Sequence, residues 1–209
     1  MKYNHSLTNS NKVIPACLSV LCLSILVLPW CLSSDILTRA AQGQIKTLEK
    51  HENYPNEPLN FVEIKAANKS VRLGEGFSAG ENWLQNASFR VKNVSNKEIV
   101  YIEIDINFPE TKSSGNEMSY RLKFGHRPAA HDSNRALSFK SDSEMILGLT
   151  AENYDRLVKF VEERQQFSTL SNATIRIGFV IFADGTAWGG GLFHRQDPNN
   201  PNRYIPVPS

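Results

Sequence analysis

The stretch Ile99–Phe108, with the sequence IVYIEIDINF, decides the fold. Apolar residues at every second position alternate with the polar residues Tyr101, Glu103, Asp105 and Asn107. Successive side chains of a β-strand point to opposite faces, so this period of two predicts a strand with one face in the core and the other in solvent. Pro109 ends the strand, because proline cannot donate a hydrogen bond to an interior ladder.

The same period of two recurs before and after this stretch. Further strands are predicted at 59–66, 71–73, 88–94, 119–124, 143–149, 173–182 and 187–193. Residues 93–97 predict the turn that leads into the central strand, and Asp184-Gly185 predicts a hairpin turn with positive φ. Short strands separated by frequent turns are typical of an all-β sandwich.

One segment has the periodicity of a helix instead. Between 151 and 165, Tyr154, Leu157, Val158 and Val161 stand at i, i+3, i+4 and i+7, and Thr150 precedes them as a candidate N-cap. This spacing gathers the apolar side chains on one face. It predicts an amphipathic helix that packs on the sandwich.

These patterns predict a mainly β fold, an immunoglobulin-like antiparallel two-sheet sandwich with one amphipathic helix. No pair of cysteines brackets a tryptophan, so the disulfide of antibody domains is not expected. The predicted organisation is a signal peptide or signal anchor at 1–33, a flexible linker at 34–57, the β-sandwich domain at 58–196 and a proline-rich C-terminal strap at 197–209.

The N-terminal segment is the basis for the predicted location. Residues 13–32 carry no charge and follow Lys2 and Lys12, the pattern of a signal peptide that sends the rest of the chain across a membrane. A stretch of this length also spans a bilayer, so an uncleaved anchor stays open as the alternative. We therefore expect an exported chain that is periplasmic, extracellular or membrane-anchored and that meets the membrane only through this segment.

Charge and cysteine content exclude several functions. The chain has 23 Lys and Arg against 21 Asp and Glu, and the excess comes from Lys2 and Lys12. The remainder is neutral, which argues against nucleic acid as a partner. All three cysteines, Cys17, Cys22 and Cys31, lie in the N-terminal segment. The predicted domain therefore has no thiol for a disulfide, a metal site or a nucleophile.

Three segments carry a resemblance to other proteins. Residues 89–104 (FRVKNVSNKEIVYIEI) are similar to paired strands in many bacterial exported sandwich modules. Residues 182–188 (FADGTAW) and 195–201 (RQDPNNP) resemble the C-terminal end of uncharacterised secreted bacterial proteins. The resemblance implies a sandwich fold and export, and it carries no catalytic residue to this chain.

Glu103 and Asp105 are the first candidates for chemistry. They point to the same side of one strand, about 7 Å apart, a separation at which two carboxylates can divide acid and base roles. The sequence supplies no pocket around them, however. We therefore expect both to be solvated surface residues.

Metal and nucleophile chemistry has little support. His126, His131, Asp132 and His194 suggest a metal site, but the five-residue spacing of the first two histidines fits neither one helix face nor one strand face. Residues 197–202 offer oxygen ligands without the spacing or terminal Glu of a calcium loop. There is no Gly-x-Ser-x-Gly elbow and no phosphate-binding glycine loop. We expect no metal, no cofactor and no catalytic residue.

A binding surface is predicted near the C-terminal end. It comprises Trp188, Gly189, Gly190, Phe193, His194 and Arg195. Flat aromatic rings can stack on a sugar or a peptide, and Trp83, Trp188, Phe193 and Tyr204 are the candidates for this role. For Trp83 and Trp188, packing in the core is the favoured alternative.

The sequence thus predicts a non-catalytic exported or membrane-anchored module that binds a protein partner or supports a cell-envelope assembly. One alternative is a module that binds carbohydrate or another small ligand. A second alternative is a metal hydrolase based on the histidines.

Overall fold

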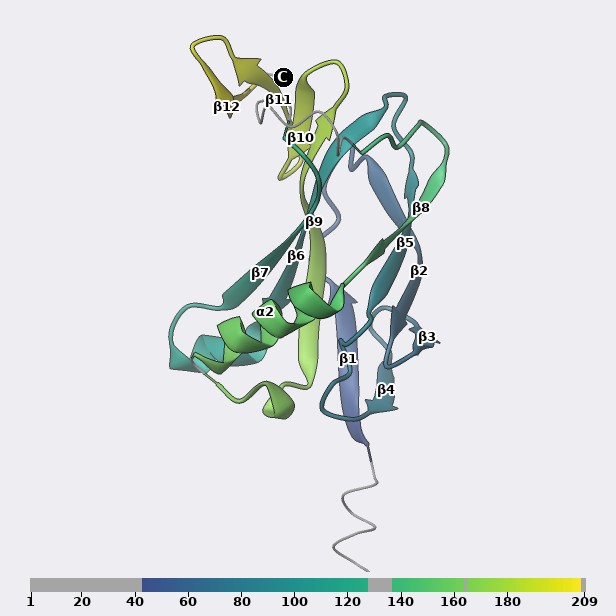
Figure 1. The fold of residues 1–209 in the computed structure, drawn as a ribbon, viewed down its shortest axis with the longest axis vertical. Helices are drawn as coiled ribbons and strands as arrows, with labels where there is room; N and C mark the ends of the chain where they lie inside the picture. Colours follow the sequence, from purple (N-terminus) through teal and green to yellow (C-terminus); the bar gives the residue numbers. More distant parts are fainter. Residues whose placement is uncertain (1–42, 128–136, 164, 208–209) are drawn as a thin grey trace, which may run out of the picture. The chain divides into compact units, whose positions relative to one another are not determined.

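The computed structural model describes residues 43–127, 137–163 and 165–207 (Figure 1). Within these ranges the strands form two sheets, one larger and one smaller. The predicted signal peptide or anchor, and the candidate metal ligands His131 and Asp132, lie outside the described residues.

The large sheet is organised around its longest strand, β9. Its members are β1 (Gln44–Lys50), β4 (Gly76–Ala79), β6 (Ile99–Phe108), β7 (Met118–Gly125), β9 (Asn172–Phe182), β10 (Thr186–Gly189), β11 (Leu192–Asp197) and β12 (Asn200–Pro206). One edge of β9 pairs with β6, which pairs in turn with β7. The other edge pairs with β1 over its first half and with β10 over its second half.

The small sheet has the order β3-β2-β5-β8. These strands are β2 (Leu59–Ala66), β3 (Lys69–Val71), β5 (Ser88–Asn93) and β8 (Glu144–Gly148). All its pairs are antiparallel, as are the described pairs of the large sheet except β1 with β9, which is parallel. The predicted mainly β, two-sheet fold is confirmed, whereas an immunoglobulin-like strand arrangement is not.

The main core fills the space between the sheets. β6 contributes Ile102, Ile104 and Ile106 to it, and β5 contributes Phe89 and Val91, all fully buried. Trp83 and Trp188 are buried in the same cluster, so the core alternative for both tryptophans is confirmed. Burial of this much apolar surface is the dominant stabilising contribution to the fold.

The predicted helix is confirmed as α2 (Ala151–Glu162). The Thr150 side chain caps it by accepting a hydrogen bond from the Asn153 backbone N–H at 3.2 Å. Tyr154, Leu157 and Val161 are buried. Two short 3-10 helices, η1 (Pro109–Ser114) and η3 (Phe167–Thr169), complete the helical structure of the described residues. None of these helices has the length and apolar character needed to cross a membrane.

Two predicted irregular segments contain strands. β1 lies within the predicted linker at 34–57. Its sequence is short and largely polar, so the burial of Lys46 and Leu48 could not be predicted from it. β12 lies within the predicted proline-rich strap. Among the described strands β12 pairs with β11 alone, and a proline on an edge strand leaves no interior hydrogen bond unmade.

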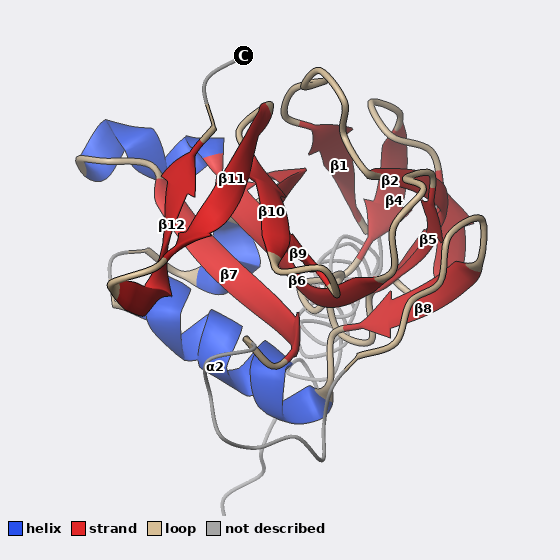
Figure 2. Cartoon of the chain, turned by 90° about the horizontal axis from the view of Figure 1, so that it is seen from above, coloured by secondary structure: helices blue, strands red, loops and turns tan. Residues whose placement is uncertain are grey.

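The predicted returning strand at 187–193 is divided into two. β10 ends at Gly189 and β11 starts at Leu192, with Gly190 and Gly191 at φ of 59° and 82° between them. Both φ values lie in the region that favours glycine. β10, β11 and β12 follow one another in the large sheet, as the view from above shows (Figure 2). The glycine run thus makes the turn of a hairpin.

Candidate functional site

The outward-facing side chains of β6 are buried, although the sequence predicts a solvated face. Glu103 and Asp105 expose only 1% and 0% of their surface. Tyr101 and Asn107, which share this face, are buried as well. The expectation that the two carboxylates are solvated was therefore wrong, because side chains from the neighbouring strands cover them.

Asp105 is held by two arginines, one from each neighbouring strand. Arg121 on β7 donates from Nε to Oδ1 at 2.7 Å and from Nη2 to Oδ2 at 3.3 Å. Arg176 on β9 approaches Oδ2 with Nε and Nη2, both at 3.0 Å. Gly178 leaves the space for this carboxylate, since a Cβ there would stand 2.8 Å from Oδ2. Asp105 thus has charged donors on both of its oxygens.

Glu103 is held in a similar way. Its Oε1 accepts hydrogen bonds from the Tyr101 hydroxyl at 2.7 Å and from Arg127 Nη2 at 2.8 Å. Its Oε2 lies 3.1 Å from Arg121 Nη1. Arg121 therefore bridges the two buried carboxylates and joins the five charged groups into one network.

The network shifts the titration of its members. Burial and the hydrogen bond to Glu103 raise the pKa of Tyr101 to about 12. The hydrogen bond to Asp105 raises the pKa of Arg121. Burial alone would lower the pKa of Arg127, but Glu103 and Tyr101 outweigh it and the pKa is raised. The phenol therefore stays neutral and the two guanidiniums stay charged throughout the physiological pH range.

The arginines form the surface above the buried carboxylates. Arg121, Arg127 and Arg176 keep 47%, 40% and 33% of their side-chain surface exposed. Lys123 stands opposite Glu103 in the β6–β7 register, is exposed and has no ion pair within the described residues. We call this surface, comprising Arg121, Lys123, Arg127 and Arg176 over Glu103 and Asp105, the arginine face. It carries two more positive than negative charges.

A small aromatic cluster adjoins the arginine face. The Phe179 ring on β9 packs edge-on against His194 at 5.7 Å and against Tyr204 at 5.5 Å between centroids. The Arg127 guanidinium lies 5.7 Å from the Phe179 ring and 5.4 Å from the Tyr101 ring. The cluster is distinct from the main core and places cationic and aromatic groups side by side.

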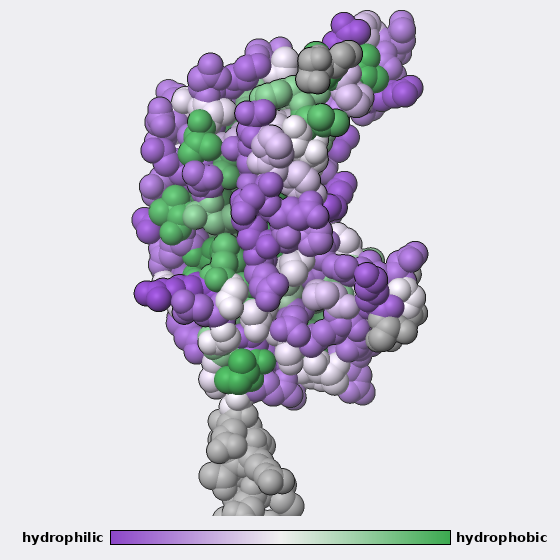
Figure 3. Space-filling view, turned by 180° about the vertical axis from the view of Figure 1, so that it is seen from behind, coloured by the Kyte–Doolittle hydropathy of each residue, from purple (hydrophilic) through white to green (hydrophobic). Residues whose placement is uncertain are grey.

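The surface has a hollow on one side in the space-filling view of the back (Figure 3). In Figure 1 the strand β7 runs along that side, between the end that carries β11 and β12 and the end that carries η1. Hydrophilic residues border the hollow. A concave polar surface of this kind can receive an elongated ligand.

The predicted binding residues are only partly brought together. Trp188 is fully buried, packs against Tyr54 and donates from Nε1 to the Pro55 carbonyl at 3.2 Å, so it cannot stack on a ligand. His194 belongs to the aromatic cluster. Gly189 leaves space for the Phe179 ring, because a Cβ at position 189 would lie 2.5 Å from Phe179 Cδ2.

The other three predicted binding residues lie at the surface. Gly190 forms the β10–β11 turn, and Phe193 and Arg195 are exposed on β11. Neither exposed side chain has a ring contact or an ion pair within the described ranges. Phe193 and Arg195 are two residues apart and so lie on the same face of β11.

The histidines do not assemble a metal site in the described part of the chain. His194 packs on Phe179, and no group of three or more His, Cys, Asp and Glu side chains able to hold a metal occurs among the described residues. Of the other candidates, His126 follows β7, while His131 and Asp132 are not described.

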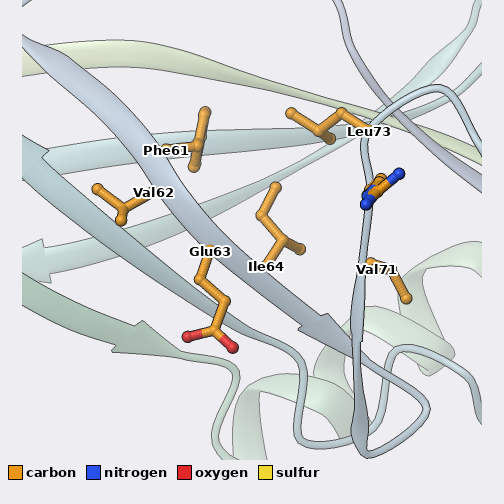
Figure 4. Close-up of a pocket in the computed structure, with 7 residues that line it drawn as sticks. Phe61, Val62, Glu63, Ile64, Val71 and Leu73 are labelled. Atoms are coloured by element: carbon orange, nitrogen blue, oxygen red, sulfur yellow. The ribbon is translucent and has the colours of Figure 1, made fainter.

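Two open pockets of similar volume lie on the described surface, one away from the arginine face and one beside it. One of about 210 Å³ lies between β2 and the segment after β3 and is lined mainly by apolar residues, with Glu63 and Arg72 as its charged members (Figure 4). The other, of about 200 Å³, is lined by His51, Asn107, Glu117 and Arg176 and adjoins the arginine face. Pockets for drug-sized ligands are typically about 300 to 1,000 Å³. Both pockets are below that range.

The arrangement favours binding over acid–base catalysis. A catalytic carboxylate must lie within hydrogen-bond reach of its substrate. Glu103 and Asp105 instead lie under guanidiniums that hold their oxygens. Guanidiniums with remaining donors are well suited to bind carboxylate or phosphate groups.

Sequence reasoning named the two carboxylates but not the arginines that hold them. A signal was present, because Arg121 and Arg176 lie in the predicted strands 119–124 and 173–182, which the structure places on either side of β6. Both arginines stand opposite Asp105 in the sheet. This placement depends on which strands are neighbours and on their exact register, and alternation within one strand does not specify either.

Comparison with known proteins adds no relative. No family model matches the chain, and no match was found among curated proteins or solved structures.

Proposed function

We propose that this chain is a non-catalytic, exported or membrane-anchored module that binds a protein partner through the arginine face. The observation that carries the proposal is the pair of buried carboxylates, Glu103 and Asp105, that fix three half-exposed guanidiniums. Groups held in place before binding lose less conformational entropy when a partner arrives.

Stability alone does not account for this arrangement. Burying two carboxylates carries a large desolvation penalty, and well-packed apolar residues are often as stable as a buried ion pair or more so. Polar networks that depart from an apolar pattern occur most often at functional sites. The outward face of β6 is such a network, because its polar side chains Tyr101, Glu103, Asp105 and Asn107 are all buried.

The composition of the surface favours a protein over a carbohydrate. Arginine and aromatic residues are enriched at protein interfaces and among their energetic hot spots. Trp188, the residue best suited to stack on a sugar, is buried instead. No observation among the described residues favours the metal hydrolase.

The proposed location rests on the sequence. The uncharged stretch at 13–32 after Lys2 and Lys12 is the pattern of an export signal or an anchor. The absence of cysteine after Cys31 is compatible with export because the domain has a large apolar core. A partner of the cell envelope follows from this location.

Site-directed photo-crosslinking in the organism that produces the chain tests the proposal. A photoreactive residue replaces Lys123 on the arginine face or, as the matched control, Lys65, an exposed strand lysine of the small sheet. We expect a discrete protein adduct from position 123 and none from position 65. Equal labelling from both positions, or no adduct from position 123, would contradict the proposed interface.

A further inference from the structure

We infer that the arginine face binds an extended peptide segment of its partner that has acidic side chains at alternate positions. This inference rests on the proposed function and names the chemistry that the partner presents. Four features of the arginine face support it: N–H groups that can take a further acceptor, the distance between its charged groups, its excess of positive charge and the aromatic cluster beside it.

The guanidiniums keep donors available for a ligand. A guanidinium has five N–H groups. Arg127 has Glu103 and Tyr101 as its polar partners within the described residues and packs against two rings, so it retains N–H groups for a further acceptor. Lys123 adds an ammonium with no ion pair in the described part of the chain. Arg127 can bind a further carboxylate without releasing Glu103, and Lys123 can bind one directly.

The spacing of the face matches an extended chain. Glu103 and Asp105 are two residues apart on β6, about 7 Å. Arg121 contacts both carboxylates, whereas Arg127 contacts Glu103 alone and Arg176 contacts Asp105 alone. Side chains on one face of an extended peptide repeat at the same distance. Acidic residues at positions i and i+2 of such a peptide would therefore meet successive cationic groups.

The charges fit such a segment. Three arginines and Lys123 stand over two carboxylates, an excess of two positive charges, although the chain beyond Lys12 is neutral as a whole. Two acidic side chains would balance this excess. Glu117 lines the adjoining pocket together with Asn107 and would repel a further acidic side chain there. The peptide segment would therefore bind over Glu103 and Asp105 and not extend toward Asn107.

The aromatic cluster adds a place for an apolar side chain. Phe179, His194 and Tyr204 lie beside Arg127, at the end of the face opposite to Asn107. An apolar residue next to the acidic pair would pack there. A segment of mixed acidic and apolar character is thus complementary to the whole surface.

The test measures binding of synthetic peptides to the full-length chain in a nonionic detergent. The probe is a peptide of alternating Glu and Ser, the matched control peptide has Gln in place of Glu, and a linear oligouronate of the same charge represents an anionic glycan. We expect the Glu peptide to bind at least about tenfold more tightly than the Gln peptide and to lose affinity as the salt concentration rises.

Two charge reversals locate the binding. Lys123→Glu removes a cation from the face without breaking an ion pair to Glu103 or Asp105 and should weaken the Glu peptide by about two- to tenfold. Lys65→Glu makes the same change in overall charge on the small sheet and should leave the affinity unchanged. Thermal unfolding of both variants, expected near that of the parent chain, excludes loss of the fold as the cause.

Three results would overturn the inference. The Glu peptide could bind no better than the Gln peptide, the oligouronate could bind as tightly as the Glu peptide, or Lys65→Glu could weaken binding as much as Lys123→Glu. If any of these occurs while position 123 still gives a specific adduct, the proposed function stands and only the acidic segment is rejected. If the adduct is also missing, both are rejected.

Discussion

Replacing Asp105 by Asn removes one negative charge from beneath the arginine face and nearly preserves the shape of the side chain. The two arginines that bind Asp105 would then face a neutral amide. Breaking a buried ion pair costs about 3–5 kcal/mol. Arg121 and Arg176 are partly exposed and water can solvate them again, so we expect a smaller loss of about 2–3 kcal/mol.

Urea unfolding followed by tryptophan fluorescence measures this loss, because Trp83 and Trp188 are both buried. For a domain of this size the expected loss corresponds to a fall in Tm of roughly 5–10 °C. Asp155→Asn, at an exposed position of α2, is the control and should stay within about 0.5 kcal/mol of the parent chain.

A loss below about 0.5 kcal/mol for Asp105→Asn would refute the reasoning. That result is the one expected for a solvated carboxylate, which is the environment that the sequence alone predicts. The variant therefore separates the structural account of this strand from the expectation based on alternation.

Further variants test the surrounding network and a second titrating site. Tyr101→Phe should cost about 1–2 kcal/mol below pH 10 through loss of the hydrogen bond to Glu103. Because the pKa of Tyr101 is raised from 10.0 to about 12, its contribution is lost as the pH rises between these values, and the deficit of the variant in urea unfolding should shrink over that window. For Asp184, burial would raise the pKa, but hydrogen bonds and a nearby lysine lower it from 3.8 to about 2. Asp184 is 48% exposed, so Asp184→Asn should cost only about 0.5–1 kcal/mol at neutral pH and nothing below about pH 2, and a deficit that persists in acid would contradict this assignment. Gly178→Ala places a Cβ 2.8 Å from Asp105 Oδ2 and should lower the free energy of unfolding by about 1–3 kcal/mol, whereas an unchanged value would mean that the carboxylate is not held there.

The regular elements could be predicted from local patterns. The central strand was predicted at 99–108 and is Ile99–Phe108, and the second strand was predicted at 59–66 and is Leu59–Ala66. The helix also begins at the predicted residue, because Thr150 marks its N-terminus. In each case the periodicity of the segment and its flanking residues determine the local structure.

The candidate site could be predicted only in part, because it depends on contacts between distant segments. Alternation showed that Glu103 and Asp105 face away from the core, but not that arginines on β7 and β9 would cover them. β1 was missed because its pairing with β9 spans more than a hundred residues of sequence and its own pattern is short. Trp188 was a candidate both for binding and for the core, and the structure buries it in the core, the alternative that the sequence favoured.

The most direct test of the account observes the guanidiniums themselves. Arg121 and Arg176 both donate from Nε to Asp105, so their Nε–H groups should give separate, slowly exchanging NMR signals at neutral pH. We expect these signals to shift on addition of the Glu peptide and to stay unchanged with the Gln peptide. Averaged signals, or signals that the Glu peptide leaves unchanged, would contradict the claim that buried carboxylates hold an arginine surface ready for an acidic partner.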